Sequence, residues 1–368
     1  MEQSAKSSSS SSSRGWEQRE RFLLGCFFQL HPHYHGSRYA ITQPSFKKSI
    51  ATQPINKFVS MSPLGNDLNE GRWGSLDESL EFLGQDAYVV ASSNGFLLCT
   101  SIVDATTRFI ICNPVMREFR FLPEPPKSYR YVSVAFICKG DYEANSSMAT
   151  VNYEVFVAGL TASETNNVSE LQIFSSETGE WDISCIESPL PFRMGRRALP
   201  GIVLEEMVYW LVGGHFLAYS RSSERVEVME VPYSEDGDHI SPDDVVFEDW
   251  LAASNGKLSY ACSLRHRLEV WVLQDCVGGR ANWNLKHSVT HRRMIQHNPT
   301  LLRRYDSSIG CVIKNLHPSD PDRVMVYMGG NMYWYDAVTG NLEKIRTSFA
   351  SADLYLTFPY EWPSNPPQ

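Results

Sequence analysis

Short apolar runs separated by turn-forming residues dominate the pattern of this chain. The runs are rich in Val, Ile, Phe, Tyr and Trp, and they are bounded by Gly, Pro, Asn and Asp. Few segments repeat their apolar residues at the 3.6-residue period of a helix, so the pattern predicts an all-β protein. The predicted strands are 87–91, 96–103, 108–113, 131–138, 151–158, 170–174, 207–212, 216–220, 225–231, 258–262, 268–273, 323–328 and 331–336.

A tight turn followed by a short apolar strand recurs along the chain. Residues 93–98 read Ser-Asn-Gly-Phe-Leu-Leu, and residues 254–259 read Ser-Asn-Gly-Lys-Leu-Ser. Residues 213–220 and 329–336 begin with Gly-Gly and continue into similar strands. A repeated turn-strand unit is typical of β-propellers and of other repeated β architectures.

A second repeated element is a strand end, a polar turn and a returning strand that carries an apolar residue. It occurs as Cys112–Phe119, Phe174–Trp181 and Tyr335–Leu342, and in degenerate form as Tyr219–Val226 and, with a longer loop, Trp271–Trp283. Gly179 and Gly340 supply turn geometry that a Cβ would hinder. The residue seven positions after the strand end is expected to return its side chain to the core.

These five units predict a β-propeller of about six kelch-like blades. Residues 57–83 and the C-terminal Tyr355–Phe358 are expected to form the sixth blade, so that both chain ends close the ring and cover an exposed edge. A pair of β-sandwiches is the alternative fold. The predicted domains are a disordered Ser-rich tail over 1–21, the propeller over 22–362 and a short tail over 363–368.

Composition narrows the classes of partner and compartment. The net charge of −9 argues against binding to a nucleic-acid backbone, which needs a basic face. No segment reaches the roughly 18 apolar residues that a membrane helix needs. None of the eight cysteines lies in a C-x-x-C pair, so we expect buried, reduced thiols in a protein of the cytoplasm or nucleus.

Two clusters have the composition of a metal site without the spacing. His31, His33 and His35 would share one face of a strand, but Pro32 and Gly36 indicate a loop, and no Cys, Asp or Glu lies at ligand spacing nearby. Residues 234–249 hold seven carboxylates, but they lack the EF-hand spacing. We therefore expect solvated loops at both places, and neither a metal nor a cofactor.

The best candidate for partner binding is a stretch over 286–304 that contains no acidic residue. Its basic and histidine residues are Lys286, His287, His291, Arg292, Arg293, His297, Arg303 and Arg304. Guanidinium groups pair bidentately with carboxylate or phosphate, so this stretch predicts docking of an acidic or phosphorylated segment. A smaller version contains Arg193, Arg196 and Arg197. The alternative for the main stretch is an exposed connecting loop.

The sequence lacks the common catalytic motifs. It contains no G-x-S-x-G, no H-E-x-x-H and no P-loop. A nucleophile with an adjacent base or a pair of carboxylates is not evident either, so we expect no enzymatic activity from this chain.

Several motifs occur in the order found in one known family. They are Gly25–Phe28, Ser75–Leu83, Ser92–Cys99, Ile111–Phe119 and Leu122-Pro123, followed by Val208–Leu211 and Tyr335–Gly340. Together they resemble the C-terminal associated domain of plant F-box proteins in the kelch-related group. The combination of Ser-Asn-Gly-x-Leu-Leu-Cys with Cys-Asn-Pro-x-x-Arg-Glu is the most specific part, and the resemblance extends over about 22–360.

The resemblance implies a protein-binding role. Members of that family are usually substrate receptors of SCF-type ubiquitin ligases, in which an N-terminal F-box binds a Skp-type adaptor and the propeller holds the target. No F-box pattern precedes Phe22, so the expected molecule is the receptor half, with an adaptor contact only if an F-box is supplied. The alternatives are a propeller that binds a glycan or small molecule in its central funnel and, with less support, a propeller hydrolase.

Overall fold

The apolar runs form strands that pair antiparallel into six sheets. In each strand, successive side chains point to opposite faces of the sheet. The computed structural model describes residues 21–30, 55–60, 80–84, 87–103, 106–128, 131–139, 148–160, 168–187, 199–212, 215–232, 248–264, 266–277, 280–302, 311–347 and 354–363. Five sheets have four strands and one has three.

Each four-stranded sheet is a meander in which neighbours along the chain are neighbours in the sheet. The first two sheets contain β3 (Tyr88–Ser93), β4 (Phe96–Val103), β5 (Thr106–Asn113) and β6 (Glu118–Phe121), then β7 (Tyr131–Lys139), β8 (Asn152–Leu160), β9 (Val168–Ser175) and β10 (Glu180–Glu187). The third contains β11 (Ile202–Leu204), β12 (Met207–Val212), β13 (His215–Ser220) and β14 (Arg225–Glu230).

The fourth and fifth sheets follow the same plan. They contain β15 (Glu248–Ser254), β16 (Lys257–Ser263), β17 (Arg267–Val277) and β18 (Arg280–Thr290), then β19 (Val312–Leu316), β20 (Arg323–Met328), β21 (Asn331–Asp336) and β22 (Leu342–Lys344). The helical elements described are α2 (His291–His297) and the short 3₁₀ turns η2 (Glu81–Leu83) and η3 (Met148–Thr150).

The sixth sheet joins both ends of the chain. It contains β2 (Ile55–Ser60), β1 (Arg21–Leu30) and β23 (Leu354–Pro363), with β1 in the middle. The expected closure by both chain ends is confirmed, although the N-terminal contribution differs from the prediction over 57–83. The strands are β1 and β2, and residues 81–83 form a 3₁₀ turn instead of a strand.

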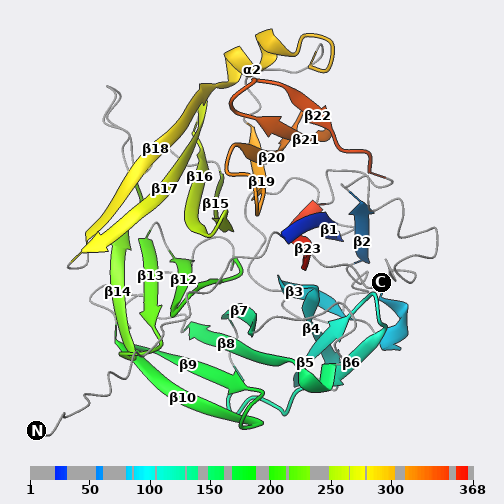
Figure 1. The fold of residues 1–368 in the computed structure, drawn as a ribbon, viewed down its shortest axis with the longest axis vertical. Helices are drawn as coiled ribbons and strands as arrows, with labels where there is room; N and C mark the ends of the chain where they lie inside the picture. The colour runs from blue at the N-terminus through cyan, green and yellow to red at the C-terminus, as the bar shows by residue number, and fades with distance from the viewer. Residues whose placement is uncertain are drawn as a thin grey trace, which may run out of the picture.

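The innermost strands form a ring. Each of β3, β7, β11, β15, β19 and β23 contacts the next, and β23 contacts β3 again. The other strands follow outward, so the sheets radiate from a common axis (Figure 1). This arrangement is a six-bladed β-propeller, as predicted, and the alternative of two β-sandwiches is wrong.

The repeated turns occupy two different places in the blades. Asn94-Gly95 and Asn255-Gly256 connect the first strand of a blade to the second, and all four residues have positive φ. Two-residue hairpin loops of type I′ need this backbone, which Asn and Gly adopt most readily. The Gly329-Gly330 pair instead lies between β20 and β21, the second and third strands of the fifth blade, and 213–214 lie outside the described residues.

The predicted hairpin anchors are cross-strand partners. The pairs Cys112 with Phe119, Phe174 with Trp181, Tyr219 with Val226 and Tyr335 with Leu342 are all in register. In the fourth blade a register shift makes Leu273, and not Trp271, the partner of Trp283. The first residue of every unit is buried, so the repeat does supply the core.

One returning residue does not reach the core. Phe119 on β6 is 40% exposed and contacts the rings of Phe82 and Phe121, with centroids 6.2 and 5.6 Å away. At β6, the outermost strand of the first blade, these aromatic side chains cover one another in place of a core contact for Phe119.

Side-chain hydrogen bonds join the closing blade to its neighbours. The Tyr360 hydroxyl on β23 donates to the Gly95 carbonyl of the first blade (2.8 Å). On the other side, the Asn315 amide of the fifth blade donates to the Thr357 carbonyl and hydroxyl oxygens (3.0 Å each). Phe27, Phe58 and Tyr360 pack around one another within the same blade. These contacts fix the ring at the point where the two chain ends meet.

All eight cysteines are unpaired, and six of them are buried, as predicted; Cys185 and Cys276 are exposed instead. Among the described residues, no group of three or more His, Cys, Asp or Glu side chains is arranged to hold a metal ion. None of the helices in the described part of the chain is long and apolar enough to cross a membrane.

Candidate functional site

The acid-free stretch forms the end of a strand and a helix, not a connecting loop. Lys286 and His287 lie on β18, and Arg292, Arg293 and His297 lie on α2, which immediately follows. In Figure 1, α2 lies at the periphery of the propeller above β21 and β22. The basic stretch therefore begins on β18 in the fourth blade and ends beside the fifth blade. Arg303 and Arg304 lie outside the described residues.

Several other predicted positions also lie outside the described residues. They are Arg193, Arg196, Arg197, His31, His33 and His35, together with 234–247. Glu248 and Asp249, which the sequence placed in a charged loop, begin strand β15 instead. There Asp249 accepts a hydrogen bond from the Tyr260 hydroxyl (3.5 Å).

Local interactions explain why α2 begins and ends where it does. Thr290 has an extended backbone, and its hydroxyl accepts a hydrogen bond from the Arg293 N–H (3.2 Å), as an N-cap residue does. Met294 is buried and anchors the helix to the core. At the other end, the Asn298 N–H donates to carbonyls of the last turn, which satisfies the helix C-terminus.

Asn298 also attaches α2 to the fifth blade. Its side-chain amide donates to the Gly340 carbonyl (2.9 Å), and its side-chain oxygen accepts from the Leu342 N–H (3.0 Å). The residue is buried, so both hydrogen bonds are protected from water. The helix is therefore held directly against the turn between β21 and β22.

That turn is itself rigid. The Asp336 carboxylate accepts the N–H groups of Val338 and Thr339 (2.9 Å each), and these hydrogen bonds, chiefly that from Thr339, lower the pKa of Asp336. Gly340 has a φ of +78°, and a Cβ at this position would lie 3.3 Å from the His297 ring. The glycine thus permits the turn, as the sequence predicted, and it also permits the close approach of α2.

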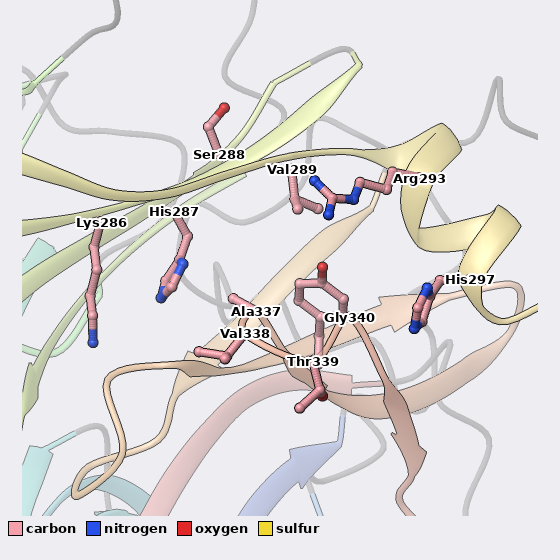
Figure 2. A pocket seen from close by; sticks show the side chains of 11 residues that line it. Lys286, His287, Ser288, Val289, Arg293, His297, Ala337, Val338, Thr339 and Gly340 are labelled. Carbon is pink, nitrogen blue, oxygen red and sulfur yellow. The ribbon is translucent and has the colours of Figure 1, made fainter.

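A cavity of about 270 Å³ lies between the helix, the end of β18 and this turn (Figure 2). Its lining comprises Lys286, His287, Ser288, Val289, Arg293, His297, Tyr335, Ala337, Val338, Thr339 and Gly340. None of these side chains is acidic, although the protein as a whole is acidic. Figure 2 shows Arg293 and His297 on the helix side of the cavity and His287 on the strand side.

Two basic side chains on β18 contact the same carboxylate. Lys286 Nζ and His287 Nε2 each lie 2.6 Å from Asp322 Oδ1, on the connection between β19 and β20. Burial opposes ionisation of Asp322, but the hydrogen bonds from Lys286 and His287 outweigh it, and the pKa of this carboxyl is lowered. The Asp322 carbonyl also accepts the Ala337 N–H (2.8 Å), which links the ion pairs to the β21–β22 turn.

Arg293 differs from these residues because its charge is not neutralised by a neighbour. Among the described residues it has no ion-pair partner, and it is exposed. Arg292, beside it, is equally exposed, but it does not line the cavity. The structure therefore distinguishes between the two arginines that the sequence named together.

His291 is not part of the basic surface. The sequence counted it with the cationic residues, but it is only 2% exposed, and neither ring nitrogen has a hydrogen-bond partner among the described residues. Burial and, secondarily, the charge of His266 lower the pKa of His291 to about 4. It is therefore neutral at pH 7 and belongs to the core beneath the helix.

Acidification is expected to destabilise the fold through this histidine. Unfolded chains protonate histidine near its ordinary pKa of about 6.5, whereas folded His291 stays neutral down to about 4. The unfolded state thus binds more protons between these values, so the free energy of unfolding falls as the pH is lowered, by at most about 1.4 kcal/mol per pH unit. Urea unfolding of the wild type and His291→Leu measures this slope.

The variant should lose part of the pH dependence and not all of it. His317, whose pKa is also lowered to about 4 by burial, contributes a second slope of the same sign. Equal slopes for the wild type and His291→Leu between pH 6.5 and 4 would contradict the assignment of His291 as a buried neutral group.

The sequence missed the turn residues of the site. Tyr335, Val338 and Thr339 were seen only as part of a repeated hairpin, because no local pattern indicates that β18 of one blade passes beside the hairpin of the next. Val338 is 70% exposed at this turn and lines the cavity.

The fold and the cavity define a six-bladed propeller with a basic recess at its rim, a class in which loops on a rigid scaffold carry binding functions. The chain belongs to the family described as F-box protein At3g26010-like, beta-propeller, which it matches over residues 74–350. The expected resemblance to the propeller domain of F-box proteins is confirmed. No curated protein matches the chain in sequence.

Solved structures with a similar arrangement are distant. A structure from an analysis of two prolyl endopeptidases is 9% identical, with a TM-score of 0.34, and the match covers 82% of this chain and 38% of that one. An α-L-arabinanase from Penicillium chrysogenum, complexed with arabinobiose, is 10% identical, with a TM-score of 0.31 and coverage of 70% and 81%. Apo AztD from Citrobacter koseri is 8% identical, with a TM-score of 0.38 and coverage of 89% and 83%. Similarity this low carries no information about the ligand of this chain.

Proposed function

We propose that this propeller is the substrate-recognition domain of an SCF-type ubiquitin ligase and that it binds a protein target at the rim cavity. Membership of the F-box propeller family supports the class of role. The observation that carries the choice of surface is a basic recess, free of acidic side chains, on an acidic protein. Arg293 and the exposed Val338 offer there the combination of charge and apolar contact that is typical of protein interfaces.

The proposal assigns no catalytic step to this chain. Ubiquitin transfer would be carried out by the other ligase subunits, and a Skp-type adaptor would be recruited through an F-box joined to the propeller. Eight unpaired cysteines are consistent with a reducing compartment, and we therefore place the protein in the cytoplasm or nucleus. A glycan or small-molecule role has less support, since many of the described aromatic side chains, including Tyr153, Tyr260, Tyr333 and Tyr360, are core residues.

A fusion experiment tests this function. An F-box is joined upstream of the chain, and ubiquitylated peptides are quantified in plant cells that express the fusion, the same fusion with Arg293→Gln, or the F-box alone. We expect a set of proteins whose ubiquitylation rises only with the complete fusion and falls with the variant. A fusion that recovers the adaptor but ubiquitylates the same proteins as the F-box alone would exclude a recognition role for the propeller.

A further inference from the structure

We propose that the rim cavity binds a phosphate monoester, namely the phosphorylated serine or threonine side chain of a target protein. The inference rests on the proposed function, because it names the chemistry by which that target would be recognised. It is carried by the cavity between α2, the end of β18 and the β21–β22 turn, with Arg293 as the principal ligand.

The charge around the cavity favours an anion. Of its ionisable lining residues, Lys286 and His287 share the single carboxylate of Asp322, which lies outside the lining. Arg293 has no acidic partner among the described residues and is free to pair with a ligand. The one other carboxylate nearby, Asp336, is occupied by the N–H groups of Val338 and Thr339. The lining therefore contains two permanent cations, Lys286 and Arg293, and no carboxylate, while Asp322 and Asp336 lie just outside it.

The size of the cavity suits one side chain. Its volume of about 270 Å³ lies just below the 300–1,000 Å³ typical of pockets for drug-sized ligands. A single phosphorylated residue at the surface of a partner needs no larger site. The walls are also fixed before binding, since Asn298 ties α2 to Gly340 and Leu342, and preorganisation lowers the entropic cost of association.

The donors favour phosphate over carboxylate. A phosphate monoester carries nearly two negative charges and three terminal oxygens, whereas a carboxylate carries one charge and two oxygens. The cavity presents nitrogen-bearing side chains from two directions, with Arg293 and His297 on α2 and His287 and Lys286 on β18 (Figure 2). Only an anion with oxygens pointing to several sides can use both walls at once, and Val338 at the rim can contact an adjacent apolar residue of the partner.

Three pools of short peptides test this assignment. The pools are degenerate around one fixed central residue, which is phosphoserine, serine or glutamate, and binding to the purified chain is measured by fluorescence anisotropy. We expect the phosphoserine pool to bind at least about tenfold more tightly than either other pool, as charge-assisted hydrogen bonds to a dianion predict. Binding should weaken with added salt and with inorganic phosphate as competitor.

Arg292 and Arg293 provide a matched pair of variants. Both are exposed, both are on α2, and Arg293→Gln and Arg292→Gln change the net charge equally. We expect Arg293→Gln to weaken binding of the phosphoserine pool about tenfold and Arg292→Gln to change it less than about twofold. Val338→Glu, at a largely exposed position, should weaken it as strongly as Arg293→Gln without removing a cation.

Three results would overturn the inference while leaving the proposed function intact. They are equal binding of the glutamate and phosphoserine pools, equal losses in Arg292→Gln and Arg293→Gln, and no binding of the phosphoserine pool by a folded chain whose F-box fusion still ubiquitylates specific targets. Conversely, selective phosphoserine binding without propeller-dependent ubiquitylation would support the site and contradict the ligase role.

Discussion

A chain that ends at residue 353 is expected to lose its cooperative fold. The deletion removes β23, the innermost strand of the sixth blade. This strand contacts β19 on one side and β3 on the other, so it closes the ring. The deletion also removes the buried side chains of Leu356, Phe358 and Tyr360. At about 1.5–3 kcal/mol for each buried side chain, the loss of about 5–9 kcal/mol is comparable to the total stability of about 5–15 kcal/mol that folded proteins possess.

Thermal unfolding followed by circular dichroism, together with size-exclusion chromatography, measures this loss. A chain that lacks only residues 364–368 is the control and should unfold like the wild type. Tyr360→Phe gives a graded comparison, because it removes only the hydrogen bond to the Gly95 carbonyl and should cost about 1–2 kcal/mol. A cooperative transition at the wild-type temperature after deletion of β23 would show that the ring does not depend on this closure.

Gly201→Ala is expected to destabilise the protein by about 3 kcal/mol, the upper part of the usual range for overpacking. Gly201 precedes β11 and donates its N–H to the Val134 carbonyl of the neighbouring blade (2.9 Å). A Cβ there would lie 2.4 Å from Trp210 Nε1 and 2.8 Å from the Ala135 Cβ. Both neighbours are buried, so neither has open space to move into.

Gly84→Ala is the matched control for this substitution. Gly84 has a φ of +66°, but nothing lies within 4 Å of the Cβ it would gain. Its cost is therefore backbone strain alone, about 1 kcal/mol. Urea unfolding of the two variants separates steric exclusion between blades from conformational strain, and equal losses in both would contradict the tight packing at Gly201.

The sequence predicted the two middle strands of each four-stranded blade better than the strands at its ends, and the innermost strands β11, β15 and β19 had no predicted counterpart. The runs 96–103, 207–212, 323–328 and 331–336 coincide with β4, β12, β20 and β21 residue for residue. These strands are packed between neighbouring blades and therefore have continuous apolar sequences. The outermost strand β18 alternates between exposed and partly exposed residues, and its polar sequence gave no strand signal beyond Trp283.

The closing blade was predicted only in part for a different reason. Its pairing joins Phe27 to Phe58 and to Phe358, so the contacts extend over most of the chain. Apolar sequence at Phe22–Phe28 indicated order, but nothing local specifies that β1 is the central strand between a near partner and a distant one. Such non-local pairings are determined by the tertiary fold and not by propensity.

The candidate site was predictable as a segment and not as a surface. The charge pattern drew attention to Arg292 and Arg293, and a helix with 3.6 residues per turn then directs two adjacent side chains differently. Only Arg293 lines the cavity. His291 shows the same effect, because a residue that looks cationic in the sequence is buried at the first position of α2 and stays neutral.

The mixed origin of the sixth blade has a consequence for biosynthesis. Strands β1 and β2 leave the ribosome before the other five blades, yet β23, the second partner of β1, begins only at Leu354. At about 5–20 residues per second, the nascent chain waits on the order of 15–60 s with an unpaired β1 edge. We expect chaperones to shield this edge during translation, and the first five blades to assemble before the circle is completed by the emergence of β23.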